Sequence, residues 1–207
     1  IVGAPDAESA GGAANEGESY VVFGGNFNGA VAHLGTAGDD TLTGSAAPET
    51  FVGGTGNDLL VGNGGADAFQ GGAGDDVVRV SSLDVHVTDG GNGSDTLELD
   101  GADLHLDLTA LADSRTRSIE RIDIDGSGSN TLTLGVLDVL NLSEESNELL
   151  VLGEAGDAVN RGAGWTTAAS GGSNGDGTST IDGQTYQIYT AGQAALLIDT
   201  DITANPS

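Results

Sequence analysis

Large apolar residues recur along residues 35–98 with a period of nine, and the positions between them follow a fixed polar pattern. The shared template is Gly-Gly-x-Gly-x-Asp-x-apolar-x, with cycles starting at positions 35, 44, 53, 62, 71 and 90 and one ten-residue step at 80–89. The apolar position is occupied in every cycle, by Leu42, Phe51, Leu60, Phe69, Val78, Val87 and Leu97. A disordered linker would not keep an apolar residue in phase, so the pattern predicts regular β-structure.

Each cycle predicts one short strand preceded by one tight turn. The x-apolar-x triplet suits a strand whose middle side chain points inward, and glycine in the six residues before it permits the positive φ angles of a turn. Two cycles then make one coil, with strands stacked on two parallel sheets. We expect Leu42, Leu60, Val78 and Leu97 on one sheet, and Phe51, Phe69 and Val87 on the other.

The sixth position of the cycle is acidic throughout, except where Val85 replaces the acid in the ten-residue step. The acids are Asp40, Glu49, Asp58, Asp67, Asp76 and Asp95. Coils stacked about 4.8 Å apart would bring these carboxylates close enough to repel one another. A divalent cation between successive loops reverses the sign of that interaction. Calcium, which takes roughly six to eight oxygen ligands, suits carboxylates combined with backbone carbonyls.

Pairs of acids one coil apart predict where the ions lie. Three pairs have glycine-rich loops: Asp40/Asp58, Asp58/Asp76 and Asp76/Asp95. The pair Glu49/Asp67 is weaker, because its first loop, SAAPE, lacks the inner glycines and carries Pro48. We therefore expect three to four calcium ions.

Composition and net charge exclude several classes of function. The 207-residue chain has 36 glycines, 32 acidic residues, five arginines, no lysine, no cysteine and a formal net charge of −27. Such a charge repels nucleic acid and anionic membranes, and the missing residue types exclude disulfides, P-loops and Schiff-base enzymes. No apolar run reaches the ~18 residues that spanning a bilayer requires. Because the chain begins at Ile1 and contains no methionine, we expect it to be a piece of a longer protein.

The block from 35 to 98 closely resembles the RTX (repeats-in-toxin) β-roll of proteins exported by bacterial type I secretion systems. The segments LDLTALADSRTRSIERIDIDGSGSNTLTLGVLDVLNLS and GDAVN resemble the region that follows such repeats. The resemblance implies a chain that is exported unfolded and folds outside the cell on binding calcium. It implies as ligands the six acids together with loop carbonyls, at Gly35, Gly38, Gly53, Gly56, Gly71 and Gly74. Asn130, in DGSGSNTLT (125–133), is an amide at the equivalent position and implies a weaker site.

A second resemblance lies at residues 1–34. IVGAP (1–5) and YVVFG (20–24) look like paired strands of an FG-GAP blade, the repeat of integrin-type β-propellers. A blade has four strands and a propeller has several blades, so residues 1–34 are expected to be only a partial FG-GAP-like strand pair. These strands would be the remnant of a propeller, or they would complete the sheet of a neighbouring molecule.

The remaining sequence predicts further β-structure. Plain alternation over 99–160 suggests β-solenoid coils without calcium loops, with helical turns in TALADSRT and GVLDVLNLS. Over 161–207, GWTTAASGG, TIDGQTYQIYT and QAALLIDTDI suggest antiparallel strands that cap the open solenoid end. The expected fold is therefore all-β: a calcium-binding parallel β-roll or β-solenoid with an antiparallel β cap at its C-terminus.

Residue patterns typical of enzymes do not predict a catalytic site in this chain. GGSNG (171–175) fits the Gly-x-Ser-x-Gly motif of serine hydrolases, but it lies in a turn-rich segment with no predicted helix after it. The three histidines are expected to be structural: His33, His86 and His105. Trp165 is expected to pack in the cap. NGDGTSTID (174–182) could offer oxygen ligands to another calcium ion, although a solvated turn is the simpler interpretation.

Together these patterns predict a secreted, non-enzymatic, calcium-binding module with two alternative roles. One is a structural part of a large secreted bacterial surface protein, such as an adhesin, a surface layer or a filament subunit. Its partners would be calcium and either further copies of itself or a cell-surface or matrix component, without nucleic acid binding or membrane insertion. The alternative is the C-terminal secretion and folding module of a type I secreted hydrolase, such as a protease or lipase.

Overall fold

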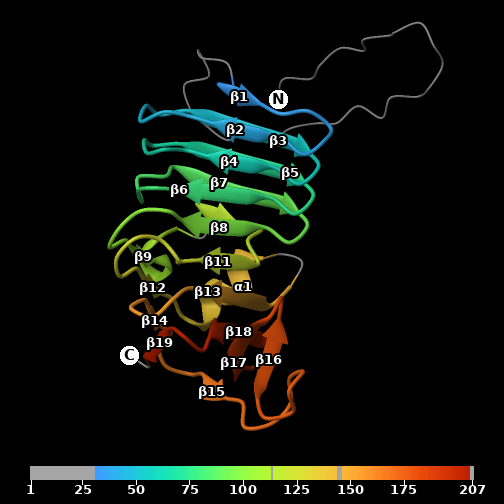
Figure 1. Ribbon diagram of the computed structural model, residues 1–207, viewed down its shortest axis with the longest axis vertical. Helices are drawn as coiled ribbons and strands as arrows, with labels where there is room; N and C mark the ends of the chain where they lie inside the picture. The colour runs from blue at the N-terminus through green and yellow to red at the C-terminus, as the bar shows by residue number, and fades with distance from the viewer. Residues whose placement is uncertain (1–30, 113, 144–145, 206–207) are drawn as a thin grey trace, which may run out of the picture. The chain divides into compact units, whose positions relative to one another are not determined.

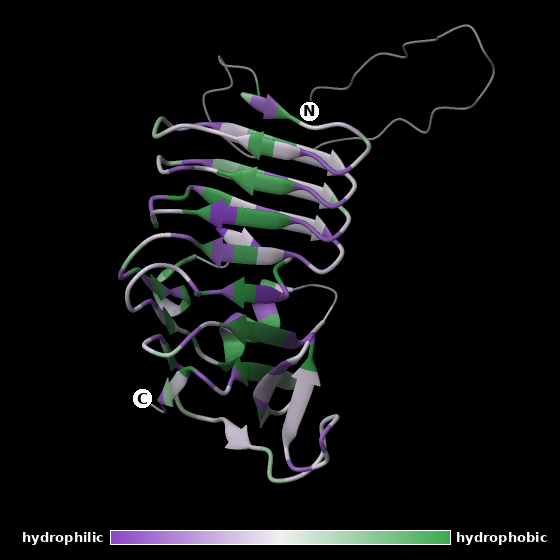
Figure 2. Ribbon diagram, in the orientation of Figure 1, coloured by the Kyte–Doolittle hydropathy of each residue, from purple (hydrophilic) through white to green (hydrophobic). Residues whose placement is uncertain are grey.

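Strands from successive coils stack in parallel register through most of the described chain (Figure 1). This computed structural model describes residues 31–112, 114–143 and 146–205. The chain from Val31 onward forms one compact unit. Figure 2 shows hydrophobic residues concentrated in the middle of many strands, and core positions such as Leu60, Val78 and Ile122 are fully buried. The inward-facing apolar positions of the strands therefore build a continuous core.

Three sheets run along the described part of the stack. The first contains β1 (His33–Leu34), β3 (Thr50–Thr55), β5 (Ala68–Ala73), β7 (Val87–Asn92) and β10 (Thr116–Arg117), in that order. The second has a parallel path through β2 (Thr41–Thr43), β4 (Leu59–Val61), β6 (Val77–Val80), β8 (Thr96–Leu99), β11 (Arg121–Asp123), β13 (Glu148–Leu152) and β18 (Ala194–Asp199). The third begins after the repeats and contains β9 (His105–Asp107), β12 (Thr131–Thr133), β14 (Ala158–Asn160) and β19 (Thr203–Asn205).

The second sheet aligns one apolar residue from every coil. The successive register partners are Leu42, Leu60, Val78, Leu97, Ile122, Val151 and Ile198. All of them except Leu42 are buried. Burying one such side chain contributes roughly 1.5–3 kcal/mol, so this row stabilises the contact between every pair of neighbouring coils. The first four residues of the row are those that the nine-residue period predicts.

An aromatic stack forms the equivalent row of the first sheet. Phe51 and Phe69 pair in register with their ring centroids 4.7 Å apart. The His33 ring stacks on Phe51 at 4.5 Å and belongs to the first described strand, β1. His33 thus continues the apolar row towards the N-terminal end, in the structural role that the sequence predicts for it.

The prediction that Val87 extends this row is wrong. The register partner of Phe69 is Thr88, which is buried, whereas Val87 is only half-buried. The glycine turns set the register here, because Gly91 pairs with Gly72 across the two strands. The extra residue of the ten-residue step is therefore absorbed before β7 begins, and the inward position must be counted back from the following turn.

Two short helices occupy corners in the coils beyond the repeats. The 3-10 helix η1 spans Leu108–Ala110, and α1 spans Val136–Leu142. The carboxylate of Asp138 accepts the backbone N–H of Gly135, just before the first turn of α1, at 2.7 Å. The predicted helical turn in GVLDVLNLS is confirmed by α1, whereas η1 overlaps TALADSRT only at Thr109 and Ala110.

Antiparallel strands are inserted in the last coil. They are β15 (Thr166–Thr167), β16 (Thr178–Ile181) and β17 (Gln184–Ala191), and both β15 and β16 pair with β17. β17 also pairs antiparallel with β18, but β18 runs parallel to β13 and rejoins the stack. QAALLIDTDI therefore forms the last solenoid strand as well as one edge of the cap.

The expected all-β class, a parallel solenoid with antiparallel strands near the C-terminus, is confirmed. The FG-GAP-like segments IVGAP and YVVFG lie outside the residues that the structure describes. Within the described ranges, no helix has the length and hydrophobicity needed to cross a membrane.

Candidate metal centre

Four aspartates lie one coil apart, each directly before a strand of the second sheet. We call this set the acidic row; it consists of Asp40, Asp58, Asp76 and Asp95, before β2, β4, β6 and β8. The Oδ1 atoms of the last three accept the backbone N–H of the preceding member, each at 2.8 Å. One carboxylate oxygen of these aspartates is thus used to tie neighbouring coils together.

The second carboxylate oxygen of Asp58, Asp76 and Asp95 lacks a hydrogen-bond partner among the described residues. The Oδ2 atoms of Asp58, Asp76 and Asp95 are buried and unpaired, and the three residues are 2%, 1% and 0% exposed. Burying an unpaired polar atom costs about 1–3 kcal/mol, and more if it is charged. Three equivalent atoms repeated along one row indicate a ligand that each of them would bind.

A small space beside each unpaired oxygen is kept open by glycine. A Cβ added to Gly53 would overlap both Asp58 Oδ2 and the carbonyl oxygen of Gly71 in the next coil. A Cβ on Gly71 would likewise overlap the corresponding pair, Asp76 Oδ2 and the carbonyl oxygen of Gly90. Each space is therefore bordered by a carboxylate of one coil and a carbonyl of the next. That donor set fits calcium, which prefers hard oxygen ligands.

Three aspartates of the acidic row, Asp58, Asp76 and Asp95, have raised pKa values. Burial, together with the negative charges of neighbouring acids, raises the pKa of Asp76 to about 6 and that of Asp95 to about 7. Burial raises the pKa of Asp58 in the same direction. A divalent cation in the adjoining space would favour the ionised carboxylates and lower these pKa values.

Asp40, at the N-terminal end of the row, is placed differently from the other members. Its Oδ2 accepts the backbone N–H of Thr36 at 2.6 Å and the Thr36 hydroxyl at 2.8 Å. A Cβ on Gly35 would still overlap the carbonyl oxygen of Gly53 and approach Asp40 Oδ2 to 3.0 Å. The space is present at this position, but its carboxylate is already hydrogen-bonded without an ion.

Glu49 and Asp67 lie directly before β3 and β5, in the first sheet. The Oδ1 atom of Asp67 accepts the backbone N–H of Glu49 at 2.8 Å, as in the acidic row. Ser45 donates its backbone N–H to Glu49 at 2.6 Å, and this hydrogen bond lowers the pKa of Glu49. Burial raises the pKa of Asp67, whose equivalent in the next coil is His86 by strand register, and not Val85 as the sequence count predicts. Glu49 is already hydrogen-bonded to Ser45, so this pair has fewer features of an ion site than Asp58, Asp76 and Asp95.

The glycines at the fourth position of the cycle lie at the outer corner of each loop. Gly56 and Gly74 have φ angles of 107° and 128°, which residues with a side chain rarely adopt. A Cβ on Gly74 would overlap the carbonyl oxygen of Gly56 in the coil before it, whereas a Cβ on Gly38 would meet nothing within 4 Å. These glycines allow the loops to stack closely, and the glycines at position one border the carboxylates.

Side chains at the fifth position of the cycle form a second row of hydrogen bonds between coils, which was not predicted from the sequence. Asp39 accepts the backbone N–H of Asn57 at 2.8 Å, Asn57 that of Asp75 at 2.9 Å, and Asp75 that of Ser94 at 2.8 Å. These side chains brace the outside of the loops that form the acidic row. An Asp or Asn repeated every 18 residues at position five was the available signal.

Asn130 makes hydrogen bonds where the repeats have unpaired oxygens. Its Oδ1 accepts the backbone N–H of Leu104 at 2.7 Å, and its amide nitrogen donates to the carbonyl of Ile124 at 2.9 Å. Both carboxylate oxygens of Asp157, one coil later, accept backbone N–H groups, from Asn130 at 2.8 Å and Glu154 at 2.9 Å. The side chains of Asn130 and Asp157 are thus hydrogen-bonded within the protein, unlike the Oδ2 atoms of Asp58, Asp76 and Asp95.

The other segments considered for chemistry are also engaged within the protein. The Ser173 hydroxyl accepts the backbone N–H of Thr180 at 2.8 Å, and Asp176 accepts the Thr178 hydroxyl at 2.6 Å. Asp182 forms an ion pair with Arg121 at 3.5 Å. In the described ranges, three or more Asp, Glu or His side chains do not converge on one point, so the candidate sites depend on carboxylates combined with carbonyls.

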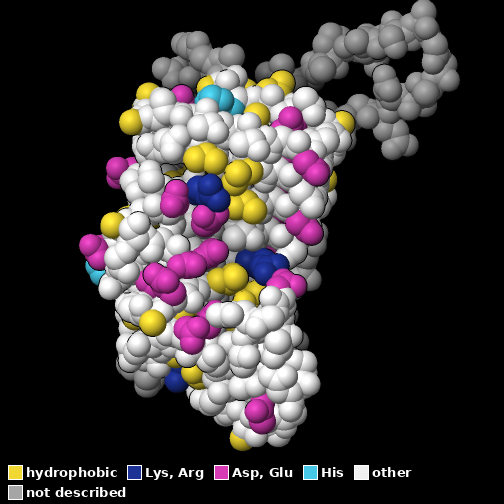
Figure 3. Space-filling model, viewed as in Figure 1, with side chains coloured by type: hydrophobic (Ala, Val, Ile, Leu, Met, Phe, Trp, Pro, Cys, Tyr) yellow, Lys and Arg dark blue, Asp and Glu magenta, His cyan; other side chains and the backbone are white. Residues whose placement is uncertain are grey.

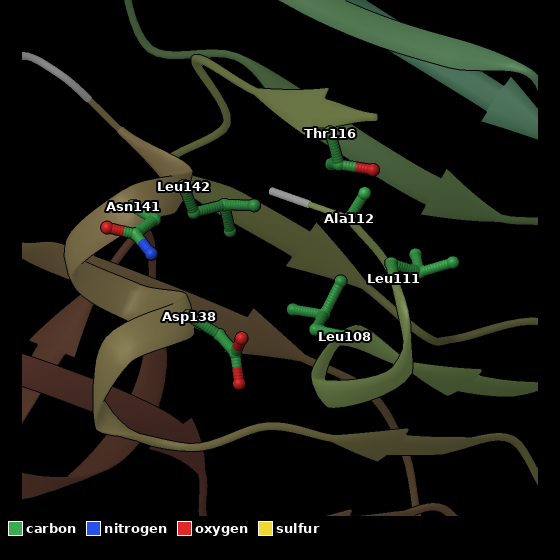
Figure 4. Close-up of a pocket in the computed structure, with 7 residues that line it drawn as sticks. All are labelled: Leu108, Leu111, Ala112, Thr116, Asp138, Asn141 and Leu142. Carbon is green, nitrogen blue, oxygen red and sulfur yellow. The ribbon is translucent and has the colours of Figure 1, made fainter. Parts of the chain in front are cut away.

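A small hollow lies between η1 and α1 (Figure 4). Its volume is about 20 Å³, and it is lined by Leu108, Leu111, Ala112, Thr116, Asp138, Asn141 and Leu142. Small-molecule sites usually measure about 300–1,000 Å³, so this hollow would hold little more than a water molecule. This hollow therefore does not have the size typical of a small-molecule site.

Comparison with known proteins agrees with this geometry. Residues 34–47 and 43–78 match the family model described as RTX calcium-binding nonapeptide repeat (4 copies). Comparisons with curated proteins and with solved structures gave no match. The matched residues include the loops of Asp40, Asp58 and Asp76, with two of the unpaired oxygens. This part of the chain is therefore built of RTX calcium-binding repeats.

Proposed function

We propose that this chain is a non-enzymatic structural module of a secreted bacterial surface protein, and that calcium outside the cell drives its folding. The observation that carries the proposal is the row of buried, unpaired carboxylate oxygens at Asp58, Asp76 and Asp95. Without ions these atoms oppose folding, and with ions they become ligands that join one coil to the next. The same residues therefore make the folded state depend on calcium.

The energetic effect of the ions is large enough to decide between folded and unfolded chains. When calcium is at ten times the dissociation constant, each site that exists only in the folded state adds about 1.4 kcal/mol of stability. Three or four such sites would add roughly 4–6 kcal/mol, similar to the ~5–15 kcal/mol net stability of a typical domain. Low calcium inside the cell would leave the repeats unfolded, which suits export through a type I secretion channel.

The charge distribution supports a role at an exposed, calcium-rich surface. Acidic side chains are spread over the visible face of the molecule, and basic ones are few (Figure 3). Three arginines form ion pairs with acids of the fold, Arg115 donates to backbone carbonyls, and Arg161 lies over the Tyr189 ring. Against a net charge of −27, four divalent ions would cancel less than a third. The remaining charge favours solubility and partners that are cationic or bridged by calcium.

Substitution of two aspartates in the acidic row tests the proposal. Asp58 faces both neighbouring coils, with Oδ1 towards Asp40 and Oδ2 beside the carbonyl of Gly71, whereas among the described residues Asp40 faces only the following coil. We expect Asp58→Asn to weaken calcium binding at two adjacent sites, and Asp40→Asn to weaken it at the terminal one alone. Calorimetric titration with calcium measures both. Equal losses in the two variants would argue against shared ligands, and a wild-type chain that binds no calcium would refute the proposal.

Self-assembly of the chain distinguishes the proposed surface role from the alternative, a folding module of a secreted hydrolase. Calcium-dependent self-association or filaments would favour the structural role that we propose. Electron microscopy and native mass of the purified chain, in calcium and in EDTA, would show this. Finding only monomers under both conditions would contradict the filament role and favour the folding module of a secreted hydrolase.

A further inference from the structure

Glu120 occupies the next place in the acidic row, although it lies outside the nine-residue pattern. Arg121 is the register partner of Thr96, so Glu120 stands one coil beyond Asp95 and directly before β11. The Oε2 atom of Glu120 accepts the backbone N–H of Asp95 at 2.9 Å. Asp95 Oδ1 accepts the N–H of Asp76 in the same way, at 2.8 Å. Glu120 thus repeats the contact that links the aspartates of the row.

The space beside Asp95 has the same construction as the spaces within the repeats. Asp95 is completely buried, and its Oδ2 atom has no hydrogen-bond partner. A Cβ added to Gly90 would overlap Asp95 Oδ2 and the carbonyl oxygen of Ser118. At Gly71 the equivalent atoms are Asp76 Oδ2 and the carbonyl oxygen of Gly90. The carbonyl of Ser118 therefore takes the place that a glycine carbonyl has in the earlier coils.

The nearby positive charges are directed elsewhere. Arg117 forms an ion pair with Asp89 at 2.7 Å, and Arg121 forms one with Asp182 at 3.5 Å. The carboxylates of Asp95 and Glu120 consequently stand together beside an oxygen-lined space, where an added cation would offset their repulsion.

We propose that Asp95, Glu120 and the carbonyl of Ser118 form a further divalent-cation site, one coil beyond the nonapeptide repeats. Calcium is the expected ion, because the ligands are hard oxygens drawn from two coils and water can complete the coordination. The proposal rests on the calcium-binding function proposed above and extends it to a residue that no repeat contains. The ion would join the last coil of the repeats to the first coil of the part that follows.

The alternative interpretation is that Glu120 only accepts a hydrogen bond from Asp95. The variant Glu120→Gln distinguishes the two interpretations. The glutamine amide oxygen still accepts the Asp95 N–H, but the negative charge of the carboxylate is lost. We expect this variant to bind one calcium ion fewer than the wild type, or to bind one ion at least tenfold more weakly. Glu148→Gln, which removes an exposed charge at the start of β13, is the matched control and should bind calcium like the wild type. Calorimetry and metal analysis of the dialysed protein give the ion count and affinities.

The outcomes distinguish this site from the proposed function. A wild-type chain without bound calcium would refute both, whereas wild-type stoichiometry and affinities in Glu120→Gln would overturn only the site at Glu120. If the variant does not fold, a crystal structure of the wild-type chain with calcium decides the question. An ion at the ~2.3–2.6 Å ligand distance of calcium from both Asp95 Oδ2 and Glu120 supports the site. An ion at Asp76 with none at Asp95 and Glu120 overturns it.

Discussion

The glycines at position one of the cycle are required because they have no side chain to fill the space beside the carboxylate. They are not required for an unusual backbone conformation. Gly71 does not have a positive φ, so its backbone conformation would tolerate an alanine. Its Cβ, however, would fill the space between Asp76 Oδ2 and the carbonyl of Gly90. A side chain of one carbon therefore competes directly with an ion for the same volume.

Alanine substitution at two repeat glycines separates these effects. We expect Gly71→Ala to lower calcium affinity at the adjoining site by at least about tenfold, or about 1.4 kcal/mol. Gly38→Ala should leave the affinity unchanged, because its Cβ would meet nothing within 4 Å and its carbonyl is retained. Calcium titration of both variants measures the difference. Wild-type affinity in Gly71→Ala would show that no ion occupies this space.

At the scale of the strands and turns, the nine-residue period predicted the coils of residues 35–98. It placed the core residues of β2, β4, β6 and β8 correctly and identified the acids directly before them. It failed at Val87, where an inserted residue broke the count and the next glycine turn set the register instead. It also could not find Glu120, because that residue follows Asp95 by 25 positions and only strand pairing brings the two together.

Asp76 and Asp95 make the stability of the calcium-free chain depend on pH. Aspartate has an ordinary pKa of 3.8, and burial raises it to about 6 at Asp76 and about 7 at Asp95. The folded state therefore binds protons more tightly than the unfolded state. The stability cost is absent below the unfolded pKa, grows as the pH rises from about 4 to about 7, and is complete above that range.

We therefore expect the calcium-free chain to be more stable at pH 5 than at pH 7.5. Glu49 and Asp176 have pKa values lowered by hydrogen bonds from Ser45 and Thr178, so their opposite effect appears only below about pH 4.5. Thermal unfolding in EDTA, followed by circular dichroism, measures the shift. In saturating calcium the trend should disappear or reverse, because protons compete with the ions. A calcium-free melting temperature that rises with pH would contradict this account.

At the scale of the whole described unit, the coils differ in what holds them together. The unpaired aspartate oxygens within the described residues belong to the repeats, at Asp58, Asp76 and Asp95. In the later coils the side chains of Asn130 and Asp157 are hydrogen-bonded to the backbone. The later coils also bury a larger share of the core, with α1 packed against β13 and β18. The two parts should therefore respond differently when calcium is removed.

Hydrogen exchange with and without calcium tests this division. In EDTA we expect the amides of β4 and β6 to exchange rapidly, since their coils would lose the ions between them. The amides of β13 and β18 should stay protected, because hydrogen bonds and apolar burial hold those strands in either condition. In calcium, protection should extend through the repeats, since in a solenoid each coil is stabilised by its neighbours. Magnesium is the control ion, because it requires a smaller octahedral site and should protect the repeats less. Equal loss of protection in all four strands would show that the later coils depend on the ions as well.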